Sequence, residues 1–135
     1  MNRNEQYRRK LELIIDKITH LPTDSIENVF PADTLSNRIL VSIDTIMELI
    51  EMLCEDQDIV VKDVYSNLDE LVEKGLLTSE MAKDIRQLNA TRYLTHRYDK
   101  IGEVVIINEK EKIFPFLKDI VKKLESIIKV HFKET

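Results

Sequence analysis

Apolar residues recur at helical spacing through a long segment in the first half of the chain. Recurrence at i, i+3, i+4 and i+7 is the period of an α-helix, whereas a half-buried strand needs strict alternation. The segment therefore predicts a helix from about Asp33 to Glu55, with Leu40 and Val41 away from the centre of its stripe. A helix that is apolar over more than half its circumference needs a second surface, either another helix of a bundle or a second copy of the protein. The stripe consists of Leu35, Ile39, Ile43, Ile46, Met47, Ile50, Leu53 and Cys54.

Three further segments before residue 102 share this helical period. The first is an amphipathic helix over residues 4–20, with an apolar stripe of Tyr7, Leu11, Ile14, Ile15 and Ile18. It ends at Leu21-Pro22, because proline disfavours the α conformation in the residue before it. Ser25 to Val29 predicts one additional turn. A third helix ends at Gly75, since glycine adopts positive φ without cost. Its apolar residues are Val61, Val64, Tyr65, Leu68, Leu71 and Val72. A fourth helix, capped by Thr78 or Ser79, should fade between Asp99 and Gly102.

The last third of the chain contains the one strand-like run, Val104 to Ile107. No second run offers a partner strand, so we expect a loop or an early helical turn packed on the core. Asn108 with Glu111 predicts a capping box for a last helix that reaches about Phe132. Pro115 would either kink that helix or mark its true start, because proline lacks the N–H that a helix interior uses.

The scarcity of turn-forming residues supports the same fold class. The 135 residues include 2 Gly and 3 Pro, which leaves little material for the tight turns of a many-stranded β protein. Leucine, isoleucine, glutamate and lysine, which favour long helices, are abundant. We therefore predict an all-α bundle of five helices, forming a single domain over residues 1–135.

Composition also excludes several classes of protein and site. No apolar run approaches the roughly 18–20 residues that span a bilayer, and the charged N-terminus lacks the core of a signal peptide. A single cysteine, Cys54, allows no internal disulfide and no metal cluster, so we expect a cytoplasmic protein without membrane contact. Two glycines cannot build a glycine-rich phosphate loop, and no cofactor or metal is predicted.

The net charge of −5 argues against a general nucleic-acid coat protein. Residues 83–100 are nevertheless net positive, with Lys83, Arg86, Arg92, Arg97 and Lys100 against Asp84 and Asp99.

The run from Arg92 to Tyr98 gathers the groups most capable of chemistry. Arg92 precedes His96 by four residues, which places both on one face of a helix. Such a pair can hold a phosphate while the imidazole moves a proton. Asn89 and Ile85 continue the same stripe backwards, so either the helix turns out of the core near Asn89 or these groups face a buried polar cleft. The plainer interpretation is a half-exposed histidine, a surface arginine and, at Tyr98, an amphipathic packing residue.

This run and the order of elements resemble the HepT-like proteins of the HEPN superfamily. The resemblance rests on Leu94-Thr95-His96-Arg97-Tyr98, on Val64-Tyr65…Leu68…Leu71…Gly75 and on the long last helix, and it extends roughly from Tyr7 to Ile128. It implies a compact all-α homodimer. Many members of the family are toxins of type II toxin–antitoxin systems, encoded beside a minimal nucleotidyltransferase antitoxin.

The resemblance also assigns roles to individual residues. It implies a metal-independent ribonuclease with RNA as substrate, in which His96 is the acid/base and Tyr98 accepts AMP from the transferase, which silences the toxin. The family motif has an arginine that is separated from the histidine by four to six residues. That arginine is missing here, because Thr91 occupies its usual position, five residues before His96. Arg92 then substitutes as the phosphate clamp, while Asn89, Thr91 and Arg97 are possible cleft-lining residues.

Two alternatives to a ribonuclease follow from the displaced arginine and from the plain interpretation of the motif. The first is a non-catalytic partner subunit of a nucleotidyltransferase, which binds nucleotide or RNA at the dimer cleft. The second is a helical dimerisation module with no site.

Overall fold

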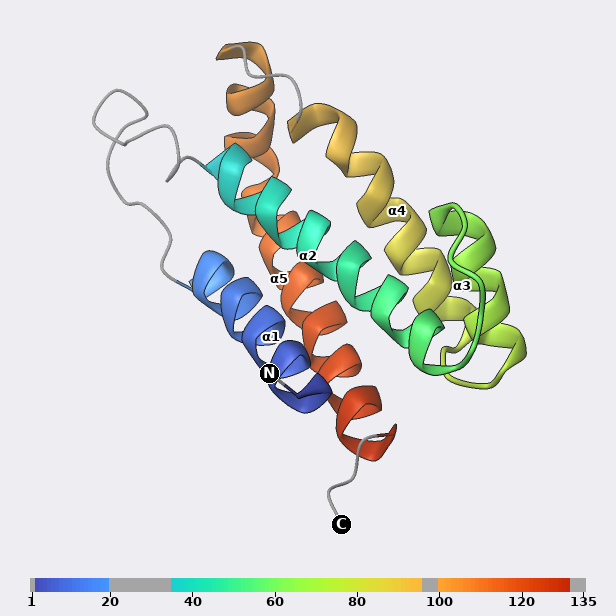
Figure 1. The fold of residues 1–135 in the computed structure, drawn as a ribbon. Helices are drawn as coiled ribbons and strands as arrows, with labels where there is room; N and C mark the ends of the chain where they lie inside the picture. The colour runs from blue at the N-terminus through green and yellow to red at the C-terminus, as the bar shows by residue number, and fades with distance from the viewer. Residues whose placement is uncertain (1, 20–34, 96–99, 132–135) are drawn as a thin grey trace.

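Helix α2 (Leu35–Asp56) lies at the centre of the structure and contacts each of the other four helices (Figure 1). The computed structural model describes residues 2–19, 35–95 and 100–131, with side chains at 2–19, 37–90 and 112–130. Every regular element in these ranges is a helix, and together they form a single domain. The all-α prediction of five helices is confirmed. The other helices are α1 (Arg3–Thr19), α3 (Val64–Glu73), α4 (Ser79–Thr95) and α5 (Lys100–His131).

The wide apolar surface of α2 is covered by the rest of the same chain. Ile39, Ile43, Ile46, Ile50 and Leu53 are all at most 1% exposed. Burying one such side chain contributes about 1.5–3 kcal/mol. The same helix carries buried residues on neighbouring stripes, among them Ser42, Leu49 and Met52. The second surface that the sequence requires is therefore supplied within the bundle, and this helix gives no separate argument for a dimer.

Helix α1 packs one face against α2 and α5. Tyr7, Leu11, Ile14 and Ile18 are buried as expected, but the inclusion of Ile15 in the apolar stripe is wrong. Ile15 is 40% exposed, because it lies about 100° around the helix from Ile14. The predicted turn from Ser25 to Val29 lies outside the described residues.

Side-chain caps and a glycine set the ends of α3 and α4. Asp63 caps α3 by accepting from the Ser66 N–H at 2.9 Å, so the predicted inclusion of Val61 is wrong. Gly75 follows α3 with φ of 79°, as expected for a left-handed position after a helix. Thr78, rather than Ser79, caps α4, with its hydroxyl oxygen 3.1 Å from the Met81 N–H.

The long last helix begins earlier than the sequence indicates. Helix α5 already includes Lys100 and Gly102, so the fourth helix does not extend to this point. Residues 104–107 are helical, as one of the two expectations had it. Asn108 lies inside α5 and is not its cap, and Pro115 does not mark its start. Buried residues on both sides of Pro115, including Phe114, Leu117 and Ile120, hold this stretch of helix against the core at the cost of one backbone hydrogen bond.

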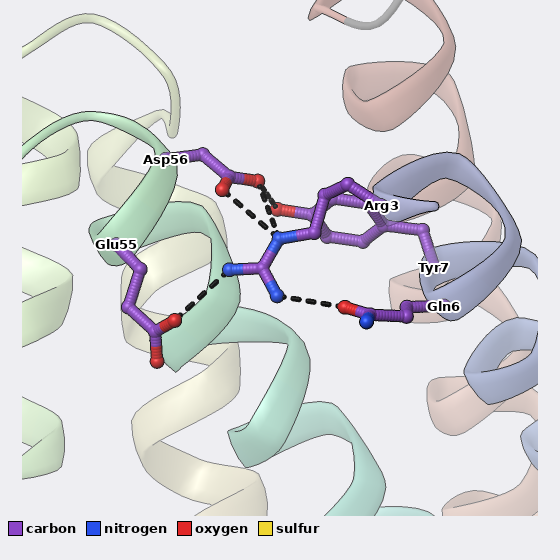
Figure 2. Close-up of polar contacts among 5 residues, drawn as sticks. All are labelled: Arg3, Gln6, Tyr7, Glu55 and Asp56. Carbon is purple, nitrogen blue, oxygen red and sulfur yellow. Dashed lines mark hydrogen bonds and ion pairs between the residues drawn. The ribbon is translucent and has the colours of Figure 1, made fainter. Parts of the chain in front are cut away.

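A polar cluster, shown in Figure 2, joins the beginning of α1 to the end of α2. The Asp56 carboxylate accepts from Tyr7 Oη at 2.6 Å and from Arg3 Nε at 2.9 and 3.1 Å. Arg3 also donates to Glu55 at 3.0 Å and to Gln6 at 2.9 Å. Tyr7 is 1% exposed, and burial together with the bond to Asp56 raises the pKa of its phenol above the usual value. The cluster therefore gives the buried hydroxyl an acceptor where the two helices meet.

Within the described ranges, no helix has the length and apolar character needed to cross a membrane.

Candidate functional site

The structure places the first part of the Arg92–Tyr98 run in the last turn of α4. Thr91 and Arg92 belong to this helix, although their side chains are not among those described. His96, Arg97 and Tyr98 lie outside the described residues. The roles predicted for these five residues therefore remain predictions.

The last two turns of α4 lie at the end of the bundle away from α3. In Figure 1 this end of α4 lies near the first turns of α2 and of α5. The helix contacts both of these elements along its length, and it contacts α3 through its earlier turns. Arg92, in the last turn of α4, therefore lies at the end of the bundle where α4 ends and α2 and α5 begin.

Asn89 is the candidate residue whose side chain the structure describes. It follows Ile85 and Leu88, which are 0% and 1% exposed, and it is itself only partly buried. Its carboxamide oxygen Oδ1 is nevertheless buried and has no hydrogen-bond partner among the described residues. The face of α4 that carries Ile85 therefore still points into the bundle at Asn89, and the helix has not turned out of the core at this position.

Arg86, one turn before Asn89, is held against α3. It forms an ion pair with Asp69 of α3, and its guanidinium carbon lies 5.9 Å from the centre of the Tyr65 ring. Both contacts hold the side chain against the surface of α3. Part of the positive charge of residues 83–100 is thus committed to packing α3 on α4.

Cys54 does not have the surroundings of a nucleophile. The residue is 0% exposed, and its sulfur lies 3.8 Å from the backbone oxygen of Asn67. Burial, with the nearby carboxylates of Glu70, Glu51 and Glu55, raises the pKa of the thiol to about 11. A thiol with that pKa is almost entirely protonated at neutral pH, so the prediction of a core residue is confirmed.

A structural polar site that the sequence analysis did not single out lies beneath the loop before α3. Asn67 is 2% exposed, accepts from the Lys62 N–H at 2.8 Å and donates to the Lys62 carbonyl at 3.2 Å. Nothing in the sequence pattern distinguishes this asparagine from a surface residue of an amphipathic helix. Among the described residues, no group of three His, Cys, Asp or Glu side chains is arranged to hold a metal ion.

Comparison with known proteins gives one family match. A family model described as Ribonuclease HepT-like matches residues 6–124. A protein of Archaeoglobus fulgidus named "Putative RNase" is 26% identical over 127 residues, covering 93% of this chain and 96% of its own length. A Methanocaldococcus jannaschii protein, also named a "Putative RNase", is 34% identical over 62 residues, covering 45% of this chain and 71% of its own. No solved structure is a significant match.

Proposed function

Because the chain belongs to the ribonuclease HepT-like family, we propose that it cleaves RNA without a metal ion, with His96 as acid/base and Arg92 as phosphate clamp. The family match carries this proposal, since it extends over residues 6–124 and so includes the whole run from Arg92 to Tyr98. The names of the archaeal relatives, which are similar to this chain over different lengths, support the same activity.

The proposed reaction is an attack of the RNA 2′-hydroxyl on the neighbouring phosphorus. The 2′-oxygen loses its proton and bonds to phosphorus, and the bond to the 5′-oxygen of the next nucleotide breaks. An imidazole can take the first proton or supply one to the leaving oxygen, which contributes about 10²- to 10⁴-fold to a rate. A guanidinium stabilises the extra negative charge of the transition state. The products are a 2′,3′-cyclic phosphate and a free 5′-hydroxyl.

Incubation of the purified protein with total RNA in EDTA tests the proposal. We expect cleavage that EDTA does not inhibit and fragments that end in a 2′,3′-cyclic phosphate. Activity that appears only when a divalent ion is added would contradict the metal-independent mechanism. Complete absence of cleavage would favour the non-catalytic alternative, a subunit that binds RNA or nucleotide, for which Thr91 at the usual arginine position is the specific argument.

We further propose that the protein is the toxin of a toxin–antitoxin pair and that AMP transfer to Tyr98 silences it. The support is the resemblance of the Leu94–Tyr98 run to the motif of HepT-like toxins, whose partner is a minimal nucleotidyltransferase. Incubation with ATP and such a transferase encoded beside the gene should add the mass of AMP to the wild type and not to Tyr98→Phe. The same mass gain in both proteins would show that Tyr98 is not the acceptor.

The family resemblance also supports a homodimer with the RNA cleft at its interface. Size-exclusion chromatography with light scattering measures this directly. We expect twice the mass of the 15.9 kDa chain, and a monomer at micromolar concentration would contradict the proposal.

A further inference from the structure

The connection between α2 and α3 contains an exposed segment, residues 59–62, that the rest of the chain holds in place. These residues belong to no helix. Ile59 is 7% exposed, and its N–H donates to the Cys54 carbonyl at 2.8 Å. Val60 and Val61, by contrast, are 73% and 38% exposed. Two aliphatic side chains therefore face solvent on a segment that is anchored at its first residue.

A single asparagine side chain fixes the other end of the 59–62 segment. The Lys62 N–H donates to Asn67 Oδ1 at 2.8 Å, and the Lys62 carbonyl accepts from Asn67 Nδ2 at 3.2 Å. Exchange of both backbone bonds with one partner is the pattern of a hydrogen-bonded residue pair in an antiparallel sheet. Asn67 belongs to α3 and is 2% exposed, so the backbone groups of Lys62 point toward that helix.

The 59–62 segment runs along α3 in the opposite direction to the helix. Lys62 Nζ lies 3.4 Å from Glu70 Oε1, and Ile59 lines the same hollow as Glu73. In Figure 1 the connection accordingly passes beside α3. The helix rises about 9 Å from Asn67 to Glu73 at 1.5 Å per residue, and three extended residues span about the same length. The contacts therefore fit an extended backbone.

Backbone alternation in this segment makes Val61 the residue available for pairing. In an extended chain the N–H and C=O groups of successive residues point to opposite sides. Because those of Lys62 point toward α3, those of Val61 point away from it. Val61 forms no hydrogen bond to the part of the chain that the structure describes. Exposed, unpaired backbone groups of an extended segment are a template for pairing with another strand.

A hollow of about 670 Å³ beside the segment has an excess of negative charge. Lys62, on the segment, is already paired with Glu70 of α3. A cationic side chain therefore suits this hollow better than an anionic one, because two further carboxylates face one further ammonium group. The charged lining residues are Asp58, Glu70, Glu73, Lys62 and Lys74.

We propose that the 59–62 segment is a docking site for an extended, cationic polypeptide segment of a partner protein, which pairs with the backbone of Val61. Strand addition of this kind takes its affinity from main-chain hydrogen bonds and its specificity from the side-chain sites beside the strand. Here the hollow receives lysine or arginine side chains, and the exposed Val60 contacts an apolar residue of the added strand.

Defined peptides and amide NMR spectra of the full chain test the proposal. The probe is a blocked hexapeptide of alternating lysine and valine, which we expect to bind with a Kd of about 1 mM and to shift the Val60 and Val61 amide resonances. Hydrogen exchange at the Val61 amide should slow about fivefold when most of the protein is bound, because the N–H enters a bond.

Two matched peptides separate backbone pairing from charge. The same peptide with N-methylated valines keeps its side chains and charge but loses N–H donors, so we expect binding about tenfold weaker. A peptide with glutamate in place of lysine should also bind more weakly.

Protein variants test the same two terms from the other side. Val61→Pro removes the N–H of Val61 without breaking a described bond and should abolish binding of the lysine peptide. Glu73→Lys, at an exposed position, should weaken that binding about threefold. Leu13→Ala, which changes an exposed apolar residue on α1, is the control and should bind like the wild type.

Four outcomes would overturn the inference. They are no binding of the lysine peptide at millimolar concentration, equal binding of its N-methylated form, equal binding of the glutamate peptide, and shifts confined to residues outside 59–62. Concentration-dependent shifts of Val60 and Val61 without any peptide would instead identify a second copy of the chain as the occupant. None of these measurements involves RNA, so their failure would leave the proposed function unaffected.

Discussion

We expect the His96→Ala variant to lose RNA cleavage by about 10²- to 10⁴-fold in kcat, the range that a positioned acid or base usually contributes. Removal of the imidazole leaves no group at position 96 that can take a proton from the 2′-hydroxyl or give one to the leaving oxygen. Single-turnover cleavage of a short RNA in EDTA measures the chemical step directly.

A matched control separates this loss from a change in the fold. His131→Ala removes the imidazole of the last residue of α5, a histidine outside the motif, and should cleave like the wild type. Both variants should unfold at nearly the wild-type temperature. Equal losses in the two variants, or full activity in His96→Ala, would show that His96 is not the catalytic acid/base.

The second large effect concerns stability rather than chemistry. We expect Asp56→Ala to lower the free energy of unfolding by about 2–3 kcal/mol, because it removes the acceptor of the buried Tyr7 hydroxyl. The Arg3 ion pair with Asp56 is partly open to solvent and should contribute little of this. Urea unfolding followed by circular dichroism gives the difference from the shift in midpoint, provided that the slope stays the same.

Two companion variants make that prediction specific. Glu51→Ala, an exposed carboxylate on the same helix, should change the free energy of unfolding by less than about 0.5 kcal/mol. In a Tyr7→Phe background the phenol hydroxyl is absent, so Asp56→Ala should cost clearly less than in the wild type. An equal cost in both backgrounds would mean that the bond between Tyr7 and Asp56 is not the source of the stability.

Sequence reasoning worked where the deciding interactions are local. The period of the apolar residues located α1 and α2 to within two residues at each end that the structure describes, because burial of one face follows directly from that period. Gly75 was recognised as a helix boundary because glycine adopts positive φ without cost, and Thr78 because its hydroxyl can cap the first turn of a helix.

The start of α5 shows where local signals mislead. Gly102, Asn108 and Pro115 each favour a break or a cap, and the sequence therefore predicted a later start. The structure continues the helix through all three positions. A cost of about 1 kcal/mol for a glycine, or about 3 for a proline, is smaller than the gain from several buried side chains on the same helix.

The candidate site likewise has one part that the sequence predicts and one part that depends on how the helices pack. The sequence predicts the grouping of Arg92, His96 and Tyr98 from their spacing, and the family match includes all three. Their arrangement stays a prediction, since His96 and Tyr98 lie outside the described residues. The burial of the Asn89 oxygen could not be predicted, since it depends on how α4 packs against the other helices.

By itself, then, the sequence determined the all-α class, the positions of most helices and the segment that carries the proposed chemistry. These follow from side chains that interact within a few residues of one another. Only the tertiary structure decided that α2 is covered by the four other helices of its own chain, and that Tyr7 meets a carboxylate 49 residues away. Periodicity shows which face of a helix is buried, but the identity of the partner depends on contacts between segments far apart in the sequence.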